Sequence, residues 1–135
     1  MELREISKLF YDIKISNQET TSFFEKETGF SLTRYEMMIY LKENGKCSQS
    51  DLQSELKIDR AAVTRHLKIL EEKNYVARKR NKENNREIVV QITGKAKIDL
   101  DRCAEKHNSM LQPLDISLNN VEAAHLSSLL NKLIN

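Results

Sequence analysis

Residues 48–92 constrain the fold most strongly, because two helical patterns follow each other there with only two residues between them. The first, SQSDLQSEL, carries two leucines on one helical face. The second, DRAAVTRHLKILEEKN, brings Val63, Leu67 and Leu70 within about 60° of one another when residues are projected at 100° intervals. The corner between them is Lys57 and Ile58. We therefore expect two short helices joined by a tight turn.

Polar residues at the start of several apolar patterns predict where helices begin. Ser48 can cap the first helix of the pair, with Asp51 near the positive end of its dipole, and Asp59 can cap the second. Thr33 and Glu36 have the spacing of a capping box at the start of TRYEMMIYLKENG, which closes on a glycine.

The segments YVARKR and REIVVQI alternate or run apolar with β-branched residues, as paired strands do. They predict a hairpin after the two helices. Its connection, RKRNKENNRE at residues 78–87, contains seven charged side chains and three asparagines. This connection is either an ordinary solvated turn or a turn that contacts a negatively charged partner.

Longer amphipathic segments flank this region on both sides. Apolar residues recur every three or four positions from Leu3 to Ile13, and the pattern extends to Gly29. After the hairpin, TGKAKIDLDRCAEKHNSMLQPL resumes helical character, with Thr93 as N-cap and Pro113 as an interruption or bend near its end. The last segment, NNVEAAHLSSLLNKLI, carries a broad apolar stripe.

Charge is distributed unevenly along the 135 residues. The net charge is +2, but residues 57–86 contain ten basic and four acidic residues, a local charge of +6. The remainder contains twelve basic and sixteen acidic residues, a charge of −4. A basic centre within an acidic remainder suits a chain that turns one face to a polyanion, although a cluster of this size also arises by chance.

Several functional classes find no support in the sequence. There is no apolar run near the ~20 residues of a membrane span and no signal-peptide pattern at the N-terminus, so we expect a cytoplasmic protein with no membrane partner. No nucleophile elbow, phosphate loop or HExxH is present, and the three histidines show no ligand spacing. We therefore expect no enzyme, no cofactor and no metal.

The order helix, corner, basic helix and charged hairpin describes a winged helix-turn-helix, and its physics fits double-stranded DNA. The major groove admits one helix whose N-terminal residues reach base edges, while the preceding helix crosses the phosphates. The candidate base-proximal residues are Arg60, Ala61, Thr64 and Arg65, and the candidate phosphate contacts are Ser48, Gln49 and Lys68. Arg65 is the best candidate for guanine. Alternatively, Arg65 and Lys68 form a solvated face that pairs with Glu72.

Residues 31–97 resemble the MarR family of bacterial transcription regulators. The resemblance rests on Val63-Thr64-Arg65, on LEEK at residues 70–73, on the charged hairpin and on Ile92-Thr93, all in the family's relative order. The expected fold is mainly α, a winged helix-turn-helix with flanking N- and C-terminal dimerisation helices. One domain then covers residues 1–135, with residues 1–30 and 94–135 as dimerisation helices and residues 31–93 as the DNA-binding lobe.

The resemblance further implies a homodimer on a pseudo-palindromic operator, with the two hairpins flanking the DNA. The family's hairpin tip usually reads Asp-x-Arg, where the Asp holds an Arg that enters the minor groove. Here the tip reads Asn84, Asn85, Arg86, so an amide replaces the acid and can bond the guanidinium only more weakly. The candidate DNA contacts of the hairpin are Arg80, Lys82, Asn84, Asn85 and Arg86, with Lys82 on a phosphate.

The sequence allows more than one interpretation of the protein's regulation and of its function. Family members are often released from DNA by small aromatic effectors, and Phe23, Phe24, Tyr35 and Tyr40 either line such a pocket or belong to the core. No ligand-binding residue is assigned. Cys47, beside a lysine, is either a thiol of lowered pKa that senses oxidants or a small packing residue. The expected function is a repressor, and the alternative is a winged helix that binds proteins.

Overall fold

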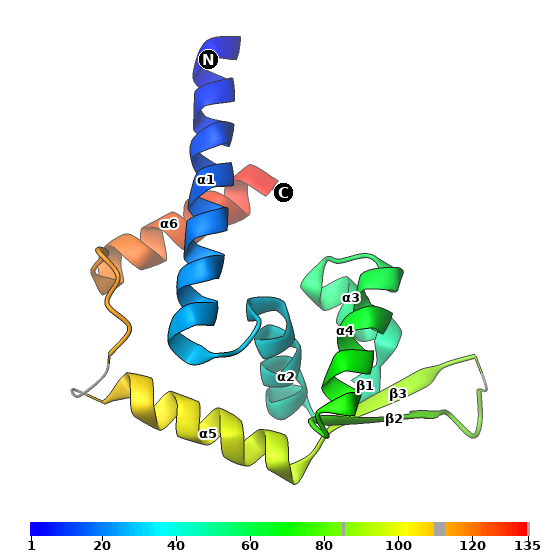
Figure 1. Cartoon of the computed structure of the whole chain (residues 1–135). Helices are drawn as coiled ribbons and strands as arrows, with labels where there is room; N and C mark the ends of the chain where they lie inside the picture. Colours follow the sequence, from blue (N-terminus) through cyan, green and yellow to red (C-terminus); the bar gives the residue numbers. More distant parts are fainter. Residues whose placement is uncertain (85, 110–112, 135) are drawn as a thin grey trace. The chain divides into compact units, whose positions relative to one another are not determined.

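The computed structural model describes residues 1–84, 86–109 and 113–134, and clusters into two units, Met1–Ala104 and Glu105–Asn135. Within the described residues it contains six helices and three short strands (Figure 1). In chain order these are α1 (Leu3–Thr28), α2 (Leu32–Asn44), β1 (Cys47–Ser48), α3 (Gln49–Leu56), α4 (Arg60–Glu72), β2 (Val76–Arg80), β3 (Ile88–Ile92), α5 (Gly94–Asn108) and α6 (Asn120–Ile134). This is the expected mainly helical winged helix-turn-helix fold. The assignment of residues 31–93 to DNA binding and of the flanking segments to dimerisation stays a prediction.

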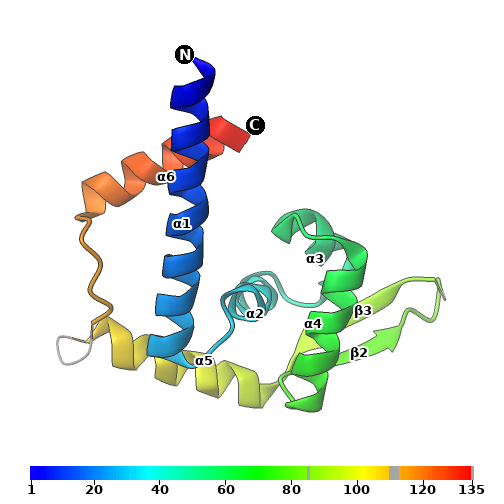
Figure 2. The same cartoon turned by 45° about the horizontal axis from the view of Figure 1, so that its top comes forward.

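The pair α3 and α4 forms the helix-turn-helix, and its caps follow the sequence pattern. Ser48 and Asp51 make a reciprocal capping box at the start of α3, with the Ser48 hydroxyl accepting from the Asp51 N–H at 3.0 Å. Lys57 takes a left-handed conformation with φ 55°, which turns the chain sharply between the helices. The Asp59 carboxylate accepts the Ala62 N–H at 2.7 Å and caps α4. Figure 2 shows α4 crossing in front of the hairpin.

The hairpin predicted from the sequence is present, and a third strand joins it. Strands β2 and β3 pair antiparallel from Val76–Ile92 to Arg80–Ile88. The two-residue strand β1 pairs with the other edge of β3, which gives the order β1-β3-β2. Two residues are too few to show the alternation by which a strand is recognised in sequence, so β1 was not anticipated.

One hydrophobic core lies in the first unit and draws on every element from α2 to the start of α5. Val63, Leu67 and Leu70 of α4 are all at most 2% exposed, which confirms the predicted stripe. The other buried apolar residues are Met37, Met38, Leu41, Leu52, Val76, Val90, Ile92, Ala96 and Leu100. Because α4 is seated on this core by one face, its opposite face is left to solvent.

The start of α2 differs from the prediction. The N-cap is Ser31, whose hydroxyl accepts the Arg34 N–H at 3.4 Å, and Thr33 lies inside the first turn. The predicted cap of Thr33 with Glu36 was therefore wrong, because the chain enters the helix two residues earlier. The predicted end at Gly45 is correct, since its N–H bonds to the Leu41 carbonyl and it adopts φ 78°.

Helix α1 is long and contributes no buried residue. It ends at Gly29, in the left-handed conformation, as predicted. The large apolar side chains it leaves exposed are Leu3, Leu9, Phe10, Tyr11 and Phe23.

Helix α5 begins at the predicted cap, where the Thr93 hydroxyl accepts the Ala96 N–H at 3.1 Å. The same hydroxyl donates to the carbonyl of Asn74 at 2.8 Å, which joins the start of α5 to the base of the hairpin. The helix ends at Asn108, short of the predicted end near Pro113.

In the second unit, Asn119 and Glu122 form a reciprocal cap at the start of α6, each side chain accepting the other's N–H. No described residue of α6 is buried, and its exposed large apolar side chains are Val121, Leu126, Leu129, Leu130, Leu133 and Ile134. Among the described residues, no helix has the length and apolar character needed to cross a membrane.

Candidate nucleic-acid interface

The exposed face of α4 has the composition expected of a helix that reads DNA. Ala61, Thr64, Arg65 and Lys68 are all exposed, opposite the buried stripe. Glu72, at the far end of the helix, is also exposed, and no ion pair joins it to Arg65 or Lys68 among the described residues. The alternative in which the two cations pair with Glu72 is therefore not seen, and their charges face solvent.

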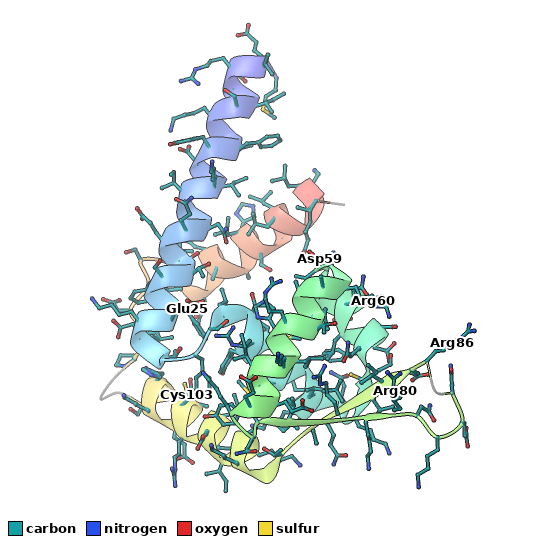
Figure 3. All side chains as sticks on the ribbon, turned by 45° about the vertical axis from the view of Figure 1, so that its right-hand side comes forward. Glu25, Asp59, Arg60, Arg80, Arg86 and Cys103 are labelled. Atoms are coloured by element: carbon teal, nitrogen blue, oxygen red, sulfur yellow. The ribbon has the colours of Figure 1, made fainter. Side chains whose placement is uncertain are left out.

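A groove of about 550 Å³ separates this helix-turn-helix from the hairpin. Arg60 at the start of α4, Arg80 at the end of β2 and Arg86 in the hairpin connection all line it, and Glu87 is its only acidic lining residue among those described. Figure 3 labels the three arginines and shows them on the side of the molecule where α4 begins and the hairpin ends. These arginines are at least six positions apart in the sequence, and the sheet brings them together around one groove.

The first residues of α3 are placed differently from the prediction. Ser48 is only 8% exposed, and its hydroxyl is occupied by the capping box. Its contact with a phosphate stays a prediction, and little of this residue lies at the surface to make it. Ser50 and Gln53, which were not anticipated, line the groove together with Gln49. Both residues lie within about one turn of Gln49 on α3, and this spacing could have identified them from the sequence.

The connection between β2 and β3 is organised by asparagine side chains. The Asn81 side-chain oxygen accepts the Glu83 N–H at 3.0 Å, and that of Asn84 accepts the Arg86 N–H at 3.1 Å. Asn84 thus shapes the backbone at Arg86, and the expected bond of its amide to the Arg86 guanidinium stays a prediction. Lys82 and Arg86 are exposed, and Asn85 lies outside the described residues.

Arg78 is a further residue of this region that the sequence reading missed. Its Nε and Nη2 donate to the two carboxylate oxygens of Glu71 on α4, at 3.4 and 3.1 Å. Its Nη1 donates to Oε1 of Gln49 on α3 at 3.2 Å. The period of two along β2 was an available signal, because Val76 faces the core and Arg78 follows on the same face. Arg78 therefore links the hairpin to both helices.

His66 connects α4 to α2 beneath the exposed face. Its Nδ1 lies 3.2 Å from Nη1 of Arg34, which can only donate, so the imidazole accepts there. Burial lowers the pKa of His66, and the neighbouring Arg34 and Arg65 lower it further. The histidine is thus held neutral and serves as a packing residue.

Cys47 does not have the environment of a reactive thiol. Burial raises its pKa to about 11 and the nearby Asp51 carboxylate adds to the effect. Of the two interpretations of Cys47, this environment supports the packing residue, because β1 brings the thiol into the sheet and next to an acid.

The four aromatic candidates for an effector pocket lie in different surroundings. Phe24 and Tyr35 stack edge to face with ring centroids 5.1 Å apart, and Tyr35 also contacts Phe30 at 5.7 Å. Tyr40 lines a separate hollow of about 490 Å³ between α2 and α3, whose lining includes three glutamates, and Phe23 is 36% exposed. These contacts favour the core interpretation for Phe24 and Tyr35. No group of three or more potential metal ligands occurs in the described parts of the chain.

The comparisons with known proteins agree on one family. The model of the MarR family matches residues 30–88. The uncharacterised HTH-type transcriptional regulator YdgJ of Bacillus subtilis (strain 168) is 39% identical over 112 residues, which cover 82% of this chain and 68% of that protein.

Solved structures share this fold. A mutant MarR of E. coli complexed with operator DNA has a TM-score of 0.83 at 23% identity, with 100% of both chains covered. BpsR of Bordetella bronchiseptica, whose DNA binding is regulated by 6-hydroxynicotinic acid, has a TM-score of 0.79 at 18% identity, covering 95% of this chain and 99% of that one.

Proposed function

Because the chain belongs to the MarR family of transcriptional regulators, we propose that it binds double-stranded DNA in the cytoplasm, at the nucleoid, and represses transcription. One observation supports the DNA surface above all others. Three arginines from α4, β2 and the hairpin connection surround a groove beside the exposed, cationic face of α4. Phosphate oxygens match such a cluster, because guanidinium groups donate to them in pairs. We propose no enzymatic activity and no cofactor.

The proposed contacts with DNA differ between α4 and the hairpin. Arg60, Ala61, Thr64 and Arg65 lie on the first two turns of α4 and face base edges in the major groove, with Arg65 reading guanine. Lys68, one turn later, meets phosphate and positions the helix without choosing sequence.

In the hairpin, Arg80 and Lys82 contact phosphate, and Asn84 shapes the turn that presents Arg86. Arg86 enters the minor groove, where the narrow groove of A-tracts favours a guanidinium. Gln49 and Gln53 lie along the groove from α3 and complete the backbone contacts.

We further propose that the protein acts as a homodimer. Helix α1 leaves five large apolar side chains exposed and buries none, and α6 on its own leaves six exposed and buries none among its described residues. A second copy of this chain is the proposed cover for both faces. Two-fold symmetry then predicts a pseudo-palindromic operator with half-sites about one helical turn apart. Release by a small aromatic effector is proposed as well, and its binding residues are not assigned.

Selection of bound sequences from random duplex DNA tests this function directly. We expect a pseudo-palindrome, and an affinity that falls with salt at a log-log slope of about −0.9 per phosphate contact. Arg65→Ala should relax the sequence preference, whereas Lys82→Ala should mainly reduce the slope. Equal behaviour of the two variants on operator and random DNA would contradict this division of roles.

The rival function, a winged helix that binds proteins, predicts a different result. In that case duplex binding at low salt is absent, or does not respond when Arg65→Ala and Arg86→Ala are combined. A thiol-sensing role for Cys47 is not proposed, because its raised pKa keeps the sulfur protonated and unreactive near neutral pH.

A further inference from the structure

A chain of hydrogen bonds runs from the hairpin to the exposed face of α4. Arg78 of β2 holds Glu71 with two donors and Gln49 with a third. The Gln49 amide nitrogen then donates to the Thr64 hydroxyl at 3.5 Å, which is the longest of these hydrogen bonds. Thr64 in turn donates its proton to the carbonyl of Arg60 at 3.0 Å. Four side chains from three elements are thus connected in series.

Arg78 determines the direction of the bonds that Gln49 makes, and the Arg60 carbonyl, which can only accept, determines the direction of the last bond. A guanidinium group has donors only, so it must meet the oxygen of the Gln49 amide. The amide nitrogen is consequently turned toward Thr64, where it can only donate. The Thr64 hydroxyl must accept there, and its single proton points back to the Arg60 carbonyl.

This direction limits what Thr64 can offer to a base. A threonine hydroxyl has one proton and two lone pairs. With the proton on Arg60 and one lone pair on Gln49, the exposed side chain is left with one lone pair and its methyl group. In the major groove these suit the amino groups of adenine and cytosine and the methyl of thymine, but not the acceptor-only edge of guanine.

We propose that Arg78 is a specificity-determining positioning residue, which sets the hydrogen-bonding state of Thr64 through Gln49 without contacting DNA. The proposal rests on the proposed function, because it requires α4 to lie in the major groove. The side chain of Arg78 is only 18% exposed, and three of its five N–H donors bond Glu71 and Gln49, so it is poorly placed to take a phosphate. Its charge therefore acts inside the protein.

The test is the base preference at the position facing Thr64, measured with wild-type protein and duplexes that vary that base pair in each half-site. Wild type should disfavour guanine by about fivefold, the size of one net hydrogen bond. Arg78→Met removes the donors, so the Gln49 amide is free to rotate and the preference should fall to within about twofold. Gln49→Leu should produce the same change, while leaving the pair of Arg78 with Glu71 in place.

Coupling between the residues separates this role from a general structural one. In a Thr64→Val background the hydroxyl is absent, so adding Arg78→Met should cause no further change at that base pair. Glu71→Gln is the matched control, because it changes the contact of Arg78 with Glu71 and not the contact with Gln49. It should leave the base preference at that position unchanged. Lys79→Met, on the same strand, controls for the loss of one positive charge.

Two results would overturn the proposal. One is additivity of Arg78→Met and Thr64→Val on base preference. The other is an equal loss of affinity on all sequences, with a salt slope reduced by about 0.9 per Arg78 removed, which is the signature of a direct phosphate contact. Failure of the proposed function is distinct from both, because wild-type protein would then show no salt-dependent duplex binding.

Discussion

Asp59 should show two opposing effects, one on folding and one on DNA binding. Its carboxylate caps the start of α4 by accepting the Ala62 N–H at 2.7 Å, and it directly precedes Arg60, which lines the groove (Figure 3 labels both residues). Asp59→Asn keeps an oxygen for the cap and removes the charge, whereas Asp59→Ala removes both. The two variants therefore separate the cap from the charge.

The stability effect follows from the cap. Replacing a capping Asp by Ala costs about 1 kcal/mol, and losing the favourable interaction of the charge with the helix dipole costs about 0.5 kcal/mol. Asp59→Ala should therefore lower the free energy of unfolding by about 1.5 kcal/mol and Asp59→Asn by about 0.5 kcal/mol. Urea denaturation at a constant protomer concentration measures both, because the stability of a dimer depends on concentration.

The binding effect has the opposite sign. A phosphate about 7 Å from the carboxylate is repelled by about 0.6 kcal/mol in water, and two of them by about 1.2 kcal/mol. Screening reduces this repulsion, so Asp59→Asn should tighten duplex binding about fivefold at 10 mM salt and about twofold at 150 mM salt. Glu36→Gln, in the hollow between α2 and α3, removes a comparable charge away from the groove and should change neither value.

Either measurement can refute the reasoning. Equal stability of the Ala and Asn variants, within about 0.3 kcal/mol, would mean that the side-chain oxygen of Asp59 does not stabilise α4. Unchanged affinity of Asp59→Asn at 10 mM salt would mean that the start of α4 does not lie beside phosphates.

Two further predictions concern Thr93 and Cys47. Thr93→Val removes the hydroxyl that accepts the Ala96 N–H and donates to the Asn74 carbonyl, so it should lower the free energy of unfolding by about 1–2 kcal/mol. Thr93→Ser keeps the hydroxyl and should lower it by less than about 0.5 kcal/mol. Equal urea midpoints for the two variants would contradict this. In a Cys103→Ser background, iodoacetamide should modify Cys47 at pH 8 more than about a hundredfold more slowly in the folded protein than in urea, because a thiol with a pKa of about 11 is almost fully protonated there. Its folded rate should keep rising beyond pH 10, and a plateau near pH 9 would show an ordinary thiol.

Features that depend on neighbouring residues were predictable from the sequence. The apolar stripe of α4 and the caps at Ser48, Asp59 and Thr93 arise within one or two helical turns, and the hairpin joins two strands that follow each other in the chain. A helical period or a cap uses atoms at most four residues apart, so the amino-acid order already contains it. The exposed cations of α4 followed from the same period, because residues opposite a buried stripe must face solvent.

Features that depend on contacts between distant residues required the tertiary structure. Strand β1 exists only because β3 supplies its partners, and the resulting burial raises the pKa of Cys47. The bonds of Arg78 to Gln49 and Glu71 join residues 29 and 7 positions apart, and the period of two that places Arg78 on the inner face of β2 does not identify these partners. The sequence alone thus determined which residues α4 exposes. Only the packing of β2 against α3 and α4 decided how one of them, Thr64, is oriented, because hydrogen-bond direction depends on the partner that each side chain meets in space.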